Sequence, residues 1–354
     1  MKKILILTRE FRGVPMGYGE EFRNAGCTVM TITSPVDCNK WDFIFRVKKR
    51  FGLSNENYYK KKDEKFAKKV YSICNEFNPD IIYVCHGTQL RPDTIMDLKK
   101  KYYMVADLID KIEFFPVLKD YVSYYDVVYT YNIEDCQYMI SNGINCKHMP
   151  ATGNSHIFKK MDCKKDIDIA FVGATYPESY YGNRLEIINR LIEDFPDKKI
   201  FIGGQCAPLR RPKKFIKWFF DSKKRSIFNN RDIDSYECNK IYNRSKICLN
   251  INRINTGEGW SERFGNIMFS GSFQIVNYNR FIAETFGDAV ETFQSYDELR
   301  EKIRYLLNNS DELGRRTEKG YLKYRNIIEK QWEKFNIVED VIRECDRKQR
   351  NLNE

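Results

Sequence analysis

The stretch Ser245-Lys-Ile-Cys-Leu-Asn-Ile-Asn252 has the pattern of a buried β-strand and opens the part of the sequence that decides the fold. A glycine-containing loop follows it, then an amphipathic segment near 263–270, and then a second apolar run, Phe273-Gln-Ile-Val276. A strand, a helix and a second strand within roughly 30 residues are typical of a βαβ unit with parallel strands. The same alternation recurs on both sides, so we expect an α/β fold with parallel sheets.

Short β-branched runs recur along the whole chain, separated by stretches with helical spacing of apolar residues. Further strands are expected at 3–7, 27–33, 79–85, 102–106 and 126–130, and then at 168–173 and 199–203. Between these two groups, Gly153, Asn154 and Ser155 precede a charged segment and predict a linker. An apolar stripe over 321–342 predicts a long C-terminal helix.

Length and composition limit the class of protein. The chain has 354 residues, 42% hydrophobic and 31% charged, which favours two globular domains and argues against wholesale disorder. No apolar run is long enough to span a membrane, and the N-terminus lacks the apolar region of a signal peptide. The 11 cysteines include no Cys-x-x-Cys pair, which excludes a zinc ribbon and a disulfide scaffold. We therefore expect a cytoplasmic protein.

The net charge of +11 is concentrated in two segments. Residues 46–69 hold ten basic and three acidic side chains, and residues 209–225 hold eight basic and one acidic. Such clusters attract phosphate, nucleic acid or anionic lipid, or they form a solvated face. In 210–225, large apolar side chains stand among the lysines: Phe215, Ile216, Trp218, Phe219 and Phe220.

Three interpretations of segment 210–225 remain open. Its aromatic residues would pack into the core, contact an anionic membrane surface, or stack on single-stranded nucleic acid. The pattern favours core packing over a membrane surface, and either of these over nucleic acid. If segments 46–69 and 210–225 do contact a membrane, the protein would be peripheral on its inner face.

Parallel sheets bind ligands at the carboxyl ends of their strands, so the loops that follow strands are the candidate sites. The loop after Asn252 begins with Arg253, contains Gly257 and Gly259, and reaches Arg263 at the start of a helix. Glycines and a helix start present backbone N–H groups to an anion, and two arginines can clamp a diphosphate. The alternative is an ordinary surface loop with exposed arginines.

Other residues could extend this candidate site. Glu258 and Asn266 would hydrogen-bond sugar or ribose hydroxyls. Gly173 ends the strand at 168–173, and Gly17 and Gly19 stand in the loop expected after the first strand, where a bare backbone can approach a phosphate or sugar. That segment is not a G-x-G-x-x-G fingerprint, which argues against a dinucleotide-binding oxidoreductase. Tight turns use the same glycines.

His86 follows the predicted strand at 79–85 directly, and Asp107 and Asp110 follow the next strand. At the carboxyl ends of strands, an imidazole or a carboxylate can orient an acceptor hydroxyl or act as a base. A structural histidine and two helix-capping aspartates are the alternative.

Two D-x-D spacings, Asp166–Asp168 and Asp232–Asp234, raise the question of a metal site. In some sugar transferases this spacing holds a divalent cation. The first pair precedes its strand instead of following it, and the second lies in a polar loop. We therefore expect no metal at either pair.

The sequence resembles the CgeB-like branch of the group 1 glycosyltransferases. The resemblance is strongest over 235–305 and looser in the first half. It is carried by these segments: 245–253, 263–271, 273–278, 168–173 and 295–304, and more loosely 79–87, 124–130 and 149–151.

The resemblance implies the α/β fold called GT-B, with two Rossmann-like parallel-sheet domains facing a cleft and a C-terminal helix crossing back to the first domain. On this basis residues 1–155 form the acceptor-side domain, 156–320 bind the nucleotide sugar, and 321–354 return to the first domain. The implied activity is transfer of a hexose-type sugar from a nucleotide-diphosphate sugar, UDP-sugar favoured, to a hydroxyl of a glycan, lipid-linked or protein acceptor. The reaction is expected to be retaining and to need no metal or other cofactor. It would serve cell-surface polysaccharide, glycolipid or protein glycosylation.

The resemblance also assigns roles to residues. Arg253 and Arg263 would stabilise the leaving diphosphate, Glu258 would position the sugar, and His86 or Asp110 would orient the acceptor. Many relatives carry Glu-x7-Glu, whereas here Glu258 takes the first position and Asn266 the second. This departure keeps open a catalytically silent nucleotide-sugar-binding protein. The basic clusters alone support a third hypothesis, a glycosyltransferase that acts on nucleic acid.

Overall fold

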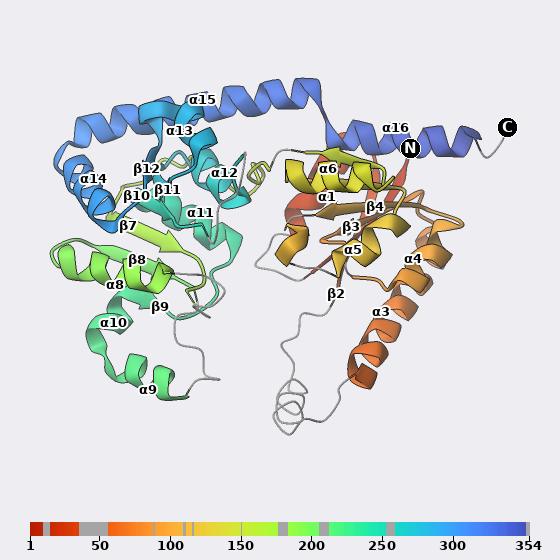
Figure 1. Ribbon diagram of the computed structural model, residues 1–354, viewed down its shortest axis with the longest axis horizontal. Coiled ribbons are helices and arrows are strands. Elements are labelled where there is room, and N and C mark those ends of the chain that lie inside the picture. Colours follow the sequence, from red (N-terminus) through yellow and green to blue (C-terminus); the bar gives the residue numbers. More distant parts are fainter. Residues whose placement is uncertain are drawn as a thin grey trace. The chain divides into compact units, whose positions relative to one another are not determined.

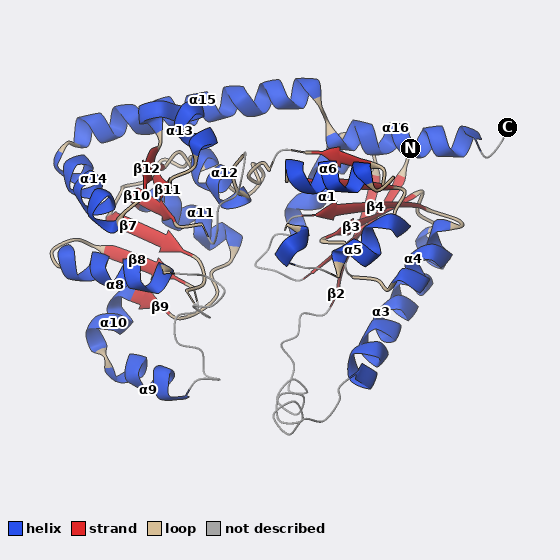
Figure 2. Cartoon of the chain, viewed as in Figure 1, coloured by secondary structure: helices blue, strands red, loops and turns tan. Residues whose placement is uncertain are grey.

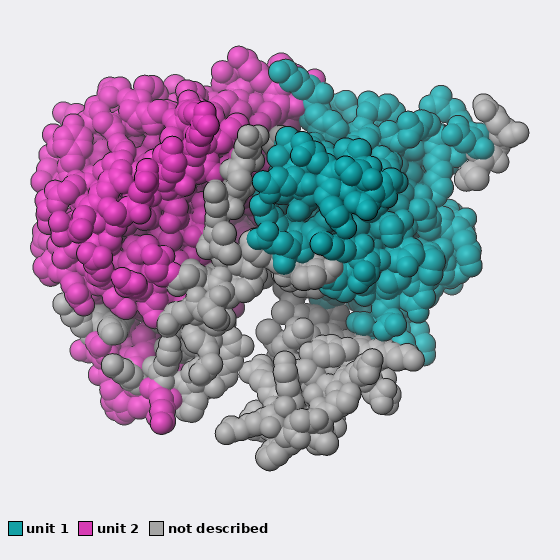
Figure 3. Space-filling view, in the orientation of Figure 1, with its two compact units in different colours: residues 1–150, 334–354 teal, residues 151–333 magenta. Residues whose placement is uncertain are grey.

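The chain forms two compact units. The computed structural model describes residues 1–9, 15–34, 56–87, 89–108, 111–114, 117–149, 151–175, 183–204, 212–252 and 259–351. One unit comprises residues 1–150 with 334–354, and the other comprises 151–333 (Figure 3).

Unit 1 is a six-stranded parallel sheet with helices on both faces (Figure 1). The strand order is β2-β1-β3-β4-β5-β6. Its strands are β1 (Lys3–Arg9), β2 (Thr28–Ser34), β3 (Ile81–Cys85), β4 (Tyr103–Leu108), β5 (Val127–Thr130) and β6 (Cys146–His148). Its α-helices are α1 (Pro15–Asn24), α3 (Glu56–Phe77), α4 (Pro92–Lys99), α5 (Leu118–Tyr121), α6 (Ile133–Ser141) and α16 (Ile337–Asn351).

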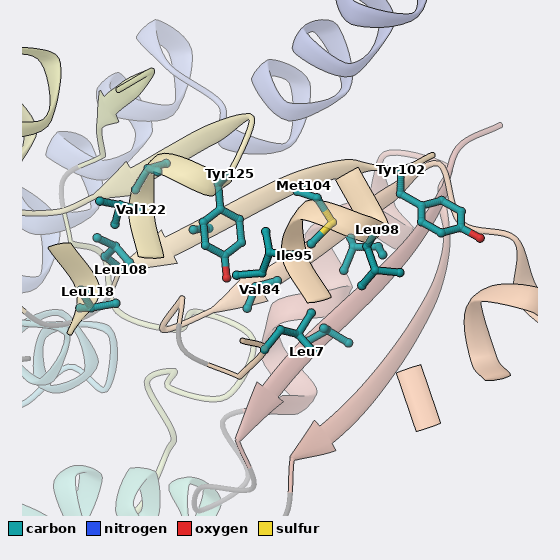
Figure 4. Close-up of a cluster of buried hydrophobic side chains, with 14 of the residues drawn as sticks. Leu7, Val84, Ile95, Leu98, Tyr102, Met104, Leu108, Leu118, Val122 and Tyr125 are labelled. Carbon is teal, nitrogen blue, oxygen red and sulfur yellow. The ribbon is translucent and has the colours of Figure 1, made fainter. Parts of the chain in front are cut away.

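Strand β1 shows why this sheet is covered on both faces. Successive side chains of a strand point to opposite faces, and all of Ile4–Leu7 are buried. Leu5 and Leu7 join the cluster formed with α3, α4 and α6, part of which is drawn in Figure 4. Ile4 and Ile6 join the cluster formed with α1 and α16. A strand buried on both faces has a continuous apolar run, as the sequence shows.

Unit 2 repeats this architecture with strand order β12-β11-β10-β7-β8-β9 (Figure 2). Its strands are β7 (Ile167–Val172), β8 (Ile200–Gly203), β9 (Phe228–Asn229), β10 (Ser245–Asn250), β11 (Phe273–Asn277) and β12 (Glu291–Phe293). Its helices are α8 (Arg184–Asp194), α9 (Pro212–Phe220), α10 (Ser222–Ile227), α11 (Ser235–Arg244), α12 (Glu262–Phe269), α13 (Arg280–Phe286), α14 (Tyr296–Asn308) and α15 (Ser310–Lys334). Both six-stranded sheets are parallel throughout, so the predicted α/β fold with two Rossmann-like sheets is confirmed.

The C-terminal helix α16 belongs to unit 1, as predicted. Val338, Val341 and Cys345 are buried in the cluster on one face of the first sheet. The predicted single helix over 321–342 is instead two helices, α15 and α16. Asn336 separates them, because its side-chain oxygen accepts a hydrogen bond from the backbone N–H of Val338 at 3.0 Å and caps the second helix.

The unit boundaries lie at 150/151 and 333/334, whereas the sequence placed them at 155/156 and 320/321. Two packing contacts explain the difference. Gly153 lies against the backbone of Gly265 in α12, and its N–H donates to the hydroxyl of Tyr324 at 3.2 Å. Tyr324 and Ile328 are fully buried in a core of unit 2. Both the linker and most of α15 therefore belong to that unit.

Gly265 provides a test of this packing. A Cβ there would overlap the Gly153 nitrogen and the Tyr324 hydroxyl, so Gly265→Ala should lower the free energy of unfolding by about 1–3 kcal/mol. Gly314→Ala, in α15, is the matched control, since its added Cβ has none of the described atoms within 4 Å. It should raise stability by about 0.5–1 kcal/mol through helix propensity. Urea unfolding of both variants measures the two effects, and equal midpoints would contradict the Gly153–Gly265 contact.

Candidate functional site

The strand order of unit 2 indicates where a ligand binds. The chain runs from β7 through β8 to β9 on one side, and then crosses to β10, β11 and β12 on the other. The order reverses between β7 and β10, and ligands of such sheets bind outside the carboxyl ends of the strands at this switch point. The candidate site therefore lies beyond Val172 and Asn250.

Gly173 follows β7 at this edge, where two strand ends approach closely. Its N–H donates to the carbonyl of Gly203 at 2.9 Å. Gly204 has φ +114°, a conformation that favours glycine, and a Cβ on it would overlap the Gly173 carbonyl. The missing side chains leave bare backbone at the switch point.

Arg263 extends over the same position from helix α12. The helix begins after Ser261, whose hydroxyl accepts a hydrogen bond from the N–H of Phe264 at 3.4 Å. This places Arg263 in the first turn, with its guanidinium carbon 5.8 Å from the centre of the Phe171 ring. A Cβ on Gly173 would lie 3.0 Å from one guanidinium nitrogen. Among the described residues, no carboxylate forms an ion pair with Arg263.

A helix start and a guanidinium without a carboxylate partner in the described part of the chain both favour a negatively charged group at this edge. Arg184 adds a second cation: its guanidinium lies 5.9 Å from the Phe171 ring and donates to the Ala174 carbonyl at 3.1 Å. The sequence analysis missed Arg184, because an arginine inside an amphipathic helix has the pattern of a solvated residue. What marks Arg184 as a candidate site residue is the burial of its side chain, which is visible only in the structure.

Asn266 connects the linker to helix α12. Its side-chain oxygen accepts a hydrogen bond from the Asn154 N–H at 2.8 Å, and its amide nitrogen donates to the Glu262 carboxylate at 3.5 Å. The side chain is half-buried one turn after Arg263. A role in binding the donor stays a prediction for Asn266.

The loop before α12 is anchored at its described end. Gly259 has φ +126°, and no atom of the described residues lies within 4 Å of a Cβ built there. The next residue, Trp260, is buried and stacks on Phe264 with ring centres 5.5 Å apart. The remaining predicted residues of this loop, Arg253, Gly257 and Glu258, lie outside the described residues, as does Asp110 of unit 1.

Sequence reasoning also missed a buried polar pair beneath the site. Asn250 donates to the Gln274 side chain at 3.2 Å, and Gln274 donates to the Phe264 carbonyl at 3.2 Å. Both side chains are fully buried. The sequence does carry a signal for this pair, namely a side-chain amide inside each of two otherwise apolar strands. A buried amide needs a hydrogen-bond partner, so two of them in neighbouring strands indicate a pair. This pair joins β10 and β11 to α12 and fixes the helix that carries Arg263.

In unit 1, His86 occupies the equivalent position. The strand order reverses between β1 and β3, and His86 directly follows β3. Its φ of +69° is unusual for a residue with a side chain, and its N–H donates to the Asp107 carbonyl at 2.7 Å. The next residue, Gly87, has φ +72° and accepts a hydrogen bond from the Tyr125 hydroxyl at 2.9 Å. Such backbone strain is concentrated at functional sites.

One positional prediction is wrong. Gly17 and Gly19 lie within helix α1, not in a loop after the first strand, because Pro15 starts the helix early. A Cβ on Gly19 would lie 3.0 Å from the Arg23 guanidinium. The alternative capping role of Asp110 lies outside the described residues, and the N–H of Ile112 donates to Asp135 of α6 at 2.9 Å. A ligand role for the two glycines stays untested.

The D-x-D pairs have structural partners. Asp166 accepts hydrogen bonds from Arg244 at 2.7 Å and Lys199 at 2.8 Å, which lower its pKa. Asp168 pairs with Lys246 at 2.7 Å. Both lie at the amino end of β7, opposite the candidate site, and Asp234 caps α11. Within the described ranges, no group of three His, Cys, Asp or Glu side chains could hold a metal ion.

Among the described residues, none of the helices is both long and apolar enough to cross a bilayer.

Solved structures similar to this chain share its two-sheet fold. Sucrose-phosphate synthase from Thermosynechococcus elongatus matches with a TM-score of 0.66 and 11% identity, over 99% of each chain. Anabaena HepE in complex with UDP and glucose matches with a TM-score of 0.60 and 9% identity, over all of both chains. A UDP-forming trehalose-phosphate synthase from Burkholderia xenovorans matches with a TM-score of 0.61 and 11% identity, over 92% of this chain and 96% of that one. At these identities the likeness establishes the fold.

No curated protein sequence matches the chain. The sequence model of one family, described as glycosyl transferase-like, matches residues 155–332, which is half of the chain and nearly all of unit 2. This range contains Gly173, Arg263 and Asn266 at the switch point. The chain therefore belongs to the glycosyl transferase-like family and is a glycosyltransferase of the GT-B fold.

Proposed function

We propose that this glycosyltransferase moves a hexose-type sugar from a nucleotide-diphosphate sugar to an acceptor hydroxyl. The observation that carries the proposal is the Arg263 guanidinium over the bare backbone of Gly173, at the switch point of the second sheet. A cation and a helix start suit the diphosphate of such a donor. Two of the similar proteins, the UDP-forming trehalose-phosphate synthase and HepE in complex with UDP and glucose, favour a UDP-sugar.

In the proposed reaction, the bond between the anomeric carbon and the phosphate oxygen breaks, and its electron pair leaves with the nucleoside diphosphate. Arg263 and the first N–H groups of α12 stabilise the charge that develops there. The acceptor oxygen bonds to the anomeric carbon and loses its proton. Arg253 would add a second cation and Glu258 would position the sugar.

His86 and Asp110 are the proposed acceptor-side residues. The strained backbone of His86 directs a side chain from the carboxyl edge of the first sheet, where an imidazole can orient a hydroxyl or accept its proton. We further propose retention of configuration and catalysis without a metal or other cofactor, with guanidinium groups taking the role of the cation. The acceptor would be a cell-surface glycan, a lipid-linked sugar or a protein, and the chain would fall in the CgeB-like branch.

One observation favours a second candidate function, a catalytically silent protein that binds nucleotide sugars. Asn266 stands where many relatives carry a glutamate, and its amide is already bonded to Asn154 and Glu262. A neutral, engaged side chain would bind ribose hydroxyls more weakly than a carboxylate.

The two functions are separated by a thermal-shift screen followed by transfer and hydrolysis assays. A UDP- or GDP-sugar at about 100 times its Kd should raise the free energy of unfolding by about 2.7 kcal/mol. Stabilisation together with transfer to any acceptor, or with slow hydrolysis, supports the enzyme. Stabilisation without turnover supports the silent protein. If no nucleotide sugar stabilises the chain, the proposed donor site is wrong.

Arg263→Ala should lower kcat/KM for the donor by about 10²–10³-fold, because it removes one preorganised charge from the developing diphosphate. Arg263→Lys should give an intermediate value, since it keeps the charge and loses the planar fork. Arg304→Ala is a matched control: its guanidinium lies 5.9 Å from the Phe195 ring, an equivalent stacking contact in the same unit. Steady-state kinetics measure these effects. Normal activity of Arg263→Ala would exclude the proposed role of Arg263 in stabilising the diphosphate.

Variants of His86 separate catalysis from backbone strain. His86→Gly should be at least as stable as the wild type, and His86→Ala should be less stable than His86→Gly by about 1 kcal/mol, because alanine resists φ of +69°. If the imidazole orients the acceptor, both variants and His86→Asn should lose kcat/KM for the acceptor alike. Full activity of His86→Asn, which tolerates the same backbone, would show that the imidazole is not used.

A further inference from the structure

The basic and aromatic segment 210–225 forms two helices of unit 2, from Pro212 onward. Helix α10 lies beside β9, the edge strand of the second sheet, and α9 packs against α10 (Figure 1). One face of α9 packs inward: Trp218 is half-buried against a core of the unit, and the Phe215 ring lies 5.6 Å from it. Core packing therefore accounts for only part of the apolar residues of this segment.

The other face of α9 leaves apolar side chains exposed. Ile216 is 53% exposed, Phe219 46% and Phe220 77%. Their spacing of three and four residues places them on one side of the helix. Apolar residues on a surface are ordinary when they are scattered, but three on one helical face mark an interaction surface.

Positive charge is concentrated along the same segment of the sequence. Residues 212–227 contain one acidic residue, Asp221, and the following basic ones: Lys213, Lys214, Lys217, Lys223, Lys224 and Arg225. Lys213 and Arg225 are exposed, and the Arg225 guanidinium lies 5.4 Å from the centre of the Phe219 ring. The exposed phenylalanines therefore stand among cations, an arrangement typical of helices that lie in a membrane interface.

We propose that α9 and α10 form a docking surface for an anionic lipid bilayer, with Ile216, Phe219 and Phe220 entering the interface. The cations complement the negative charge of the headgroups, and the apolar side chains reach the acyl boundary. A second copy of this chain is disfavoured, because a symmetric contact would bring two such basic surfaces together.

Nucleic acid fits this surface less well. Stacking on bases needs open aromatic faces, whereas the Phe219 ring already stacks on Phe215 at 6.0 Å and is perpendicular to Phe220 at 5.4 Å. The proposal does not rest on the proposed function, since it uses no residue of the donor site. The second basic segment, 46–69, contributes nothing to it, because residues 46–55 lie outside the described residues.

Vesicle sedimentation tests the proposal with the full chain. The probes are vesicles of phosphatidylcholine alone and vesicles in which about one third of the lipid is phosphatidylglycerol. The wild type should partition about tenfold or more strongly to the anionic vesicles, and added salt should weaken this binding. The double variant Phe219→Ser with Phe220→Ser should reduce partitioning by about tenfold, because it removes the inserted apolar groups.

The charge-reversed variant Lys213→Glu with Arg225→Glu should reduce partitioning to anionic vesicles and leave binding to neutral ones unchanged. Leu322→Ser, 57% exposed on α15, is the matched control and should bind as the wild type does. Urea unfolding verifies that each variant is folded. If the double phenylalanine variant is unstable, the vesicle partitioning of the single variant Phe220→Ser is used to test the proposal instead.

Three binding results would overturn the proposal. They are equal partitioning of the wild type to both vesicles, unchanged partitioning of the phenylalanine and charge variants, and tighter binding to a single-stranded oligonucleotide than to anionic vesicles. Concentration-dependent dimerisation that Phe220→Ser abolishes would likewise assign the surface to a second copy.

Discussion

Unit 2 depends on one close contact, in which two backbones meet without side chains. Gly153 and Gly265 touch, and the Tyr324 hydroxyl accepts a hydrogen bond from the Gly153 N–H. Burial raises the pKa of Tyr324 well above its usual range, so its phenol stays neutral. Around it lie Trp260 and Phe264, with ring centres 5.9 and 6.1 Å from that of Tyr324. The linker, the helix that bears Arg263 and α15 are thereby fixed to one another, because an added side chain at either glycine has no space.

Unit 1 is completed by a helix that is distant in the sequence, and a charged network specifies where that helix docks. Tyr129 donates to Asp340 at 2.7 Å, and Lys147 bridges Asp340 and Glu344 at 2.7 and 2.9 Å. Asp340 and Glu344 are almost fully buried. Buried ion pairs add little net stability, yet leaving one partner alone is costly. The network therefore excludes alternative registers of α16 on the sheet, while Val338 and Val341 provide the apolar burial.

The sequence predicted the parts of the fold that are dictated by burial. Strands that are buried on both faces have continuous apolar runs, which are easy to recognise in a sequence. All nine strands expected on this basis are present in the structure. Three short strands were missed: β6, β9 and β12 have two or three residues each and lie at sheet edges. An edge strand pairs on one side only, so its sequence carries little apolar signal.

The same reasoning explains what was found at the candidate site. Arg263 was predictable, because a helix start after a strand restricts where its guanidinium can lie. The Asn250–Gln274 hydrogen bond and the burial of Arg184 could not be predicted from the sequence. Each depends on which residues the fold brings next to that side chain. Gly17 and Gly19 were assigned to a loop on residue type alone, yet helices tolerate glycine at modest cost.

The structure offers a local reason for the asparagine at position 266. Glu262 lies one helical turn before it, and the Asn266 amide donates to that carboxylate at 3.5 Å. A glutamate at 266 would place two like charges four residues apart on α12, which is destabilising. It would also replace a side chain whose oxygen holds the Asn154 N–H at 2.8 Å. The amide thus serves the packing of the linker against α12, so its presence follows from the structure of unit 2 and does not by itself indicate that catalysis has been lost.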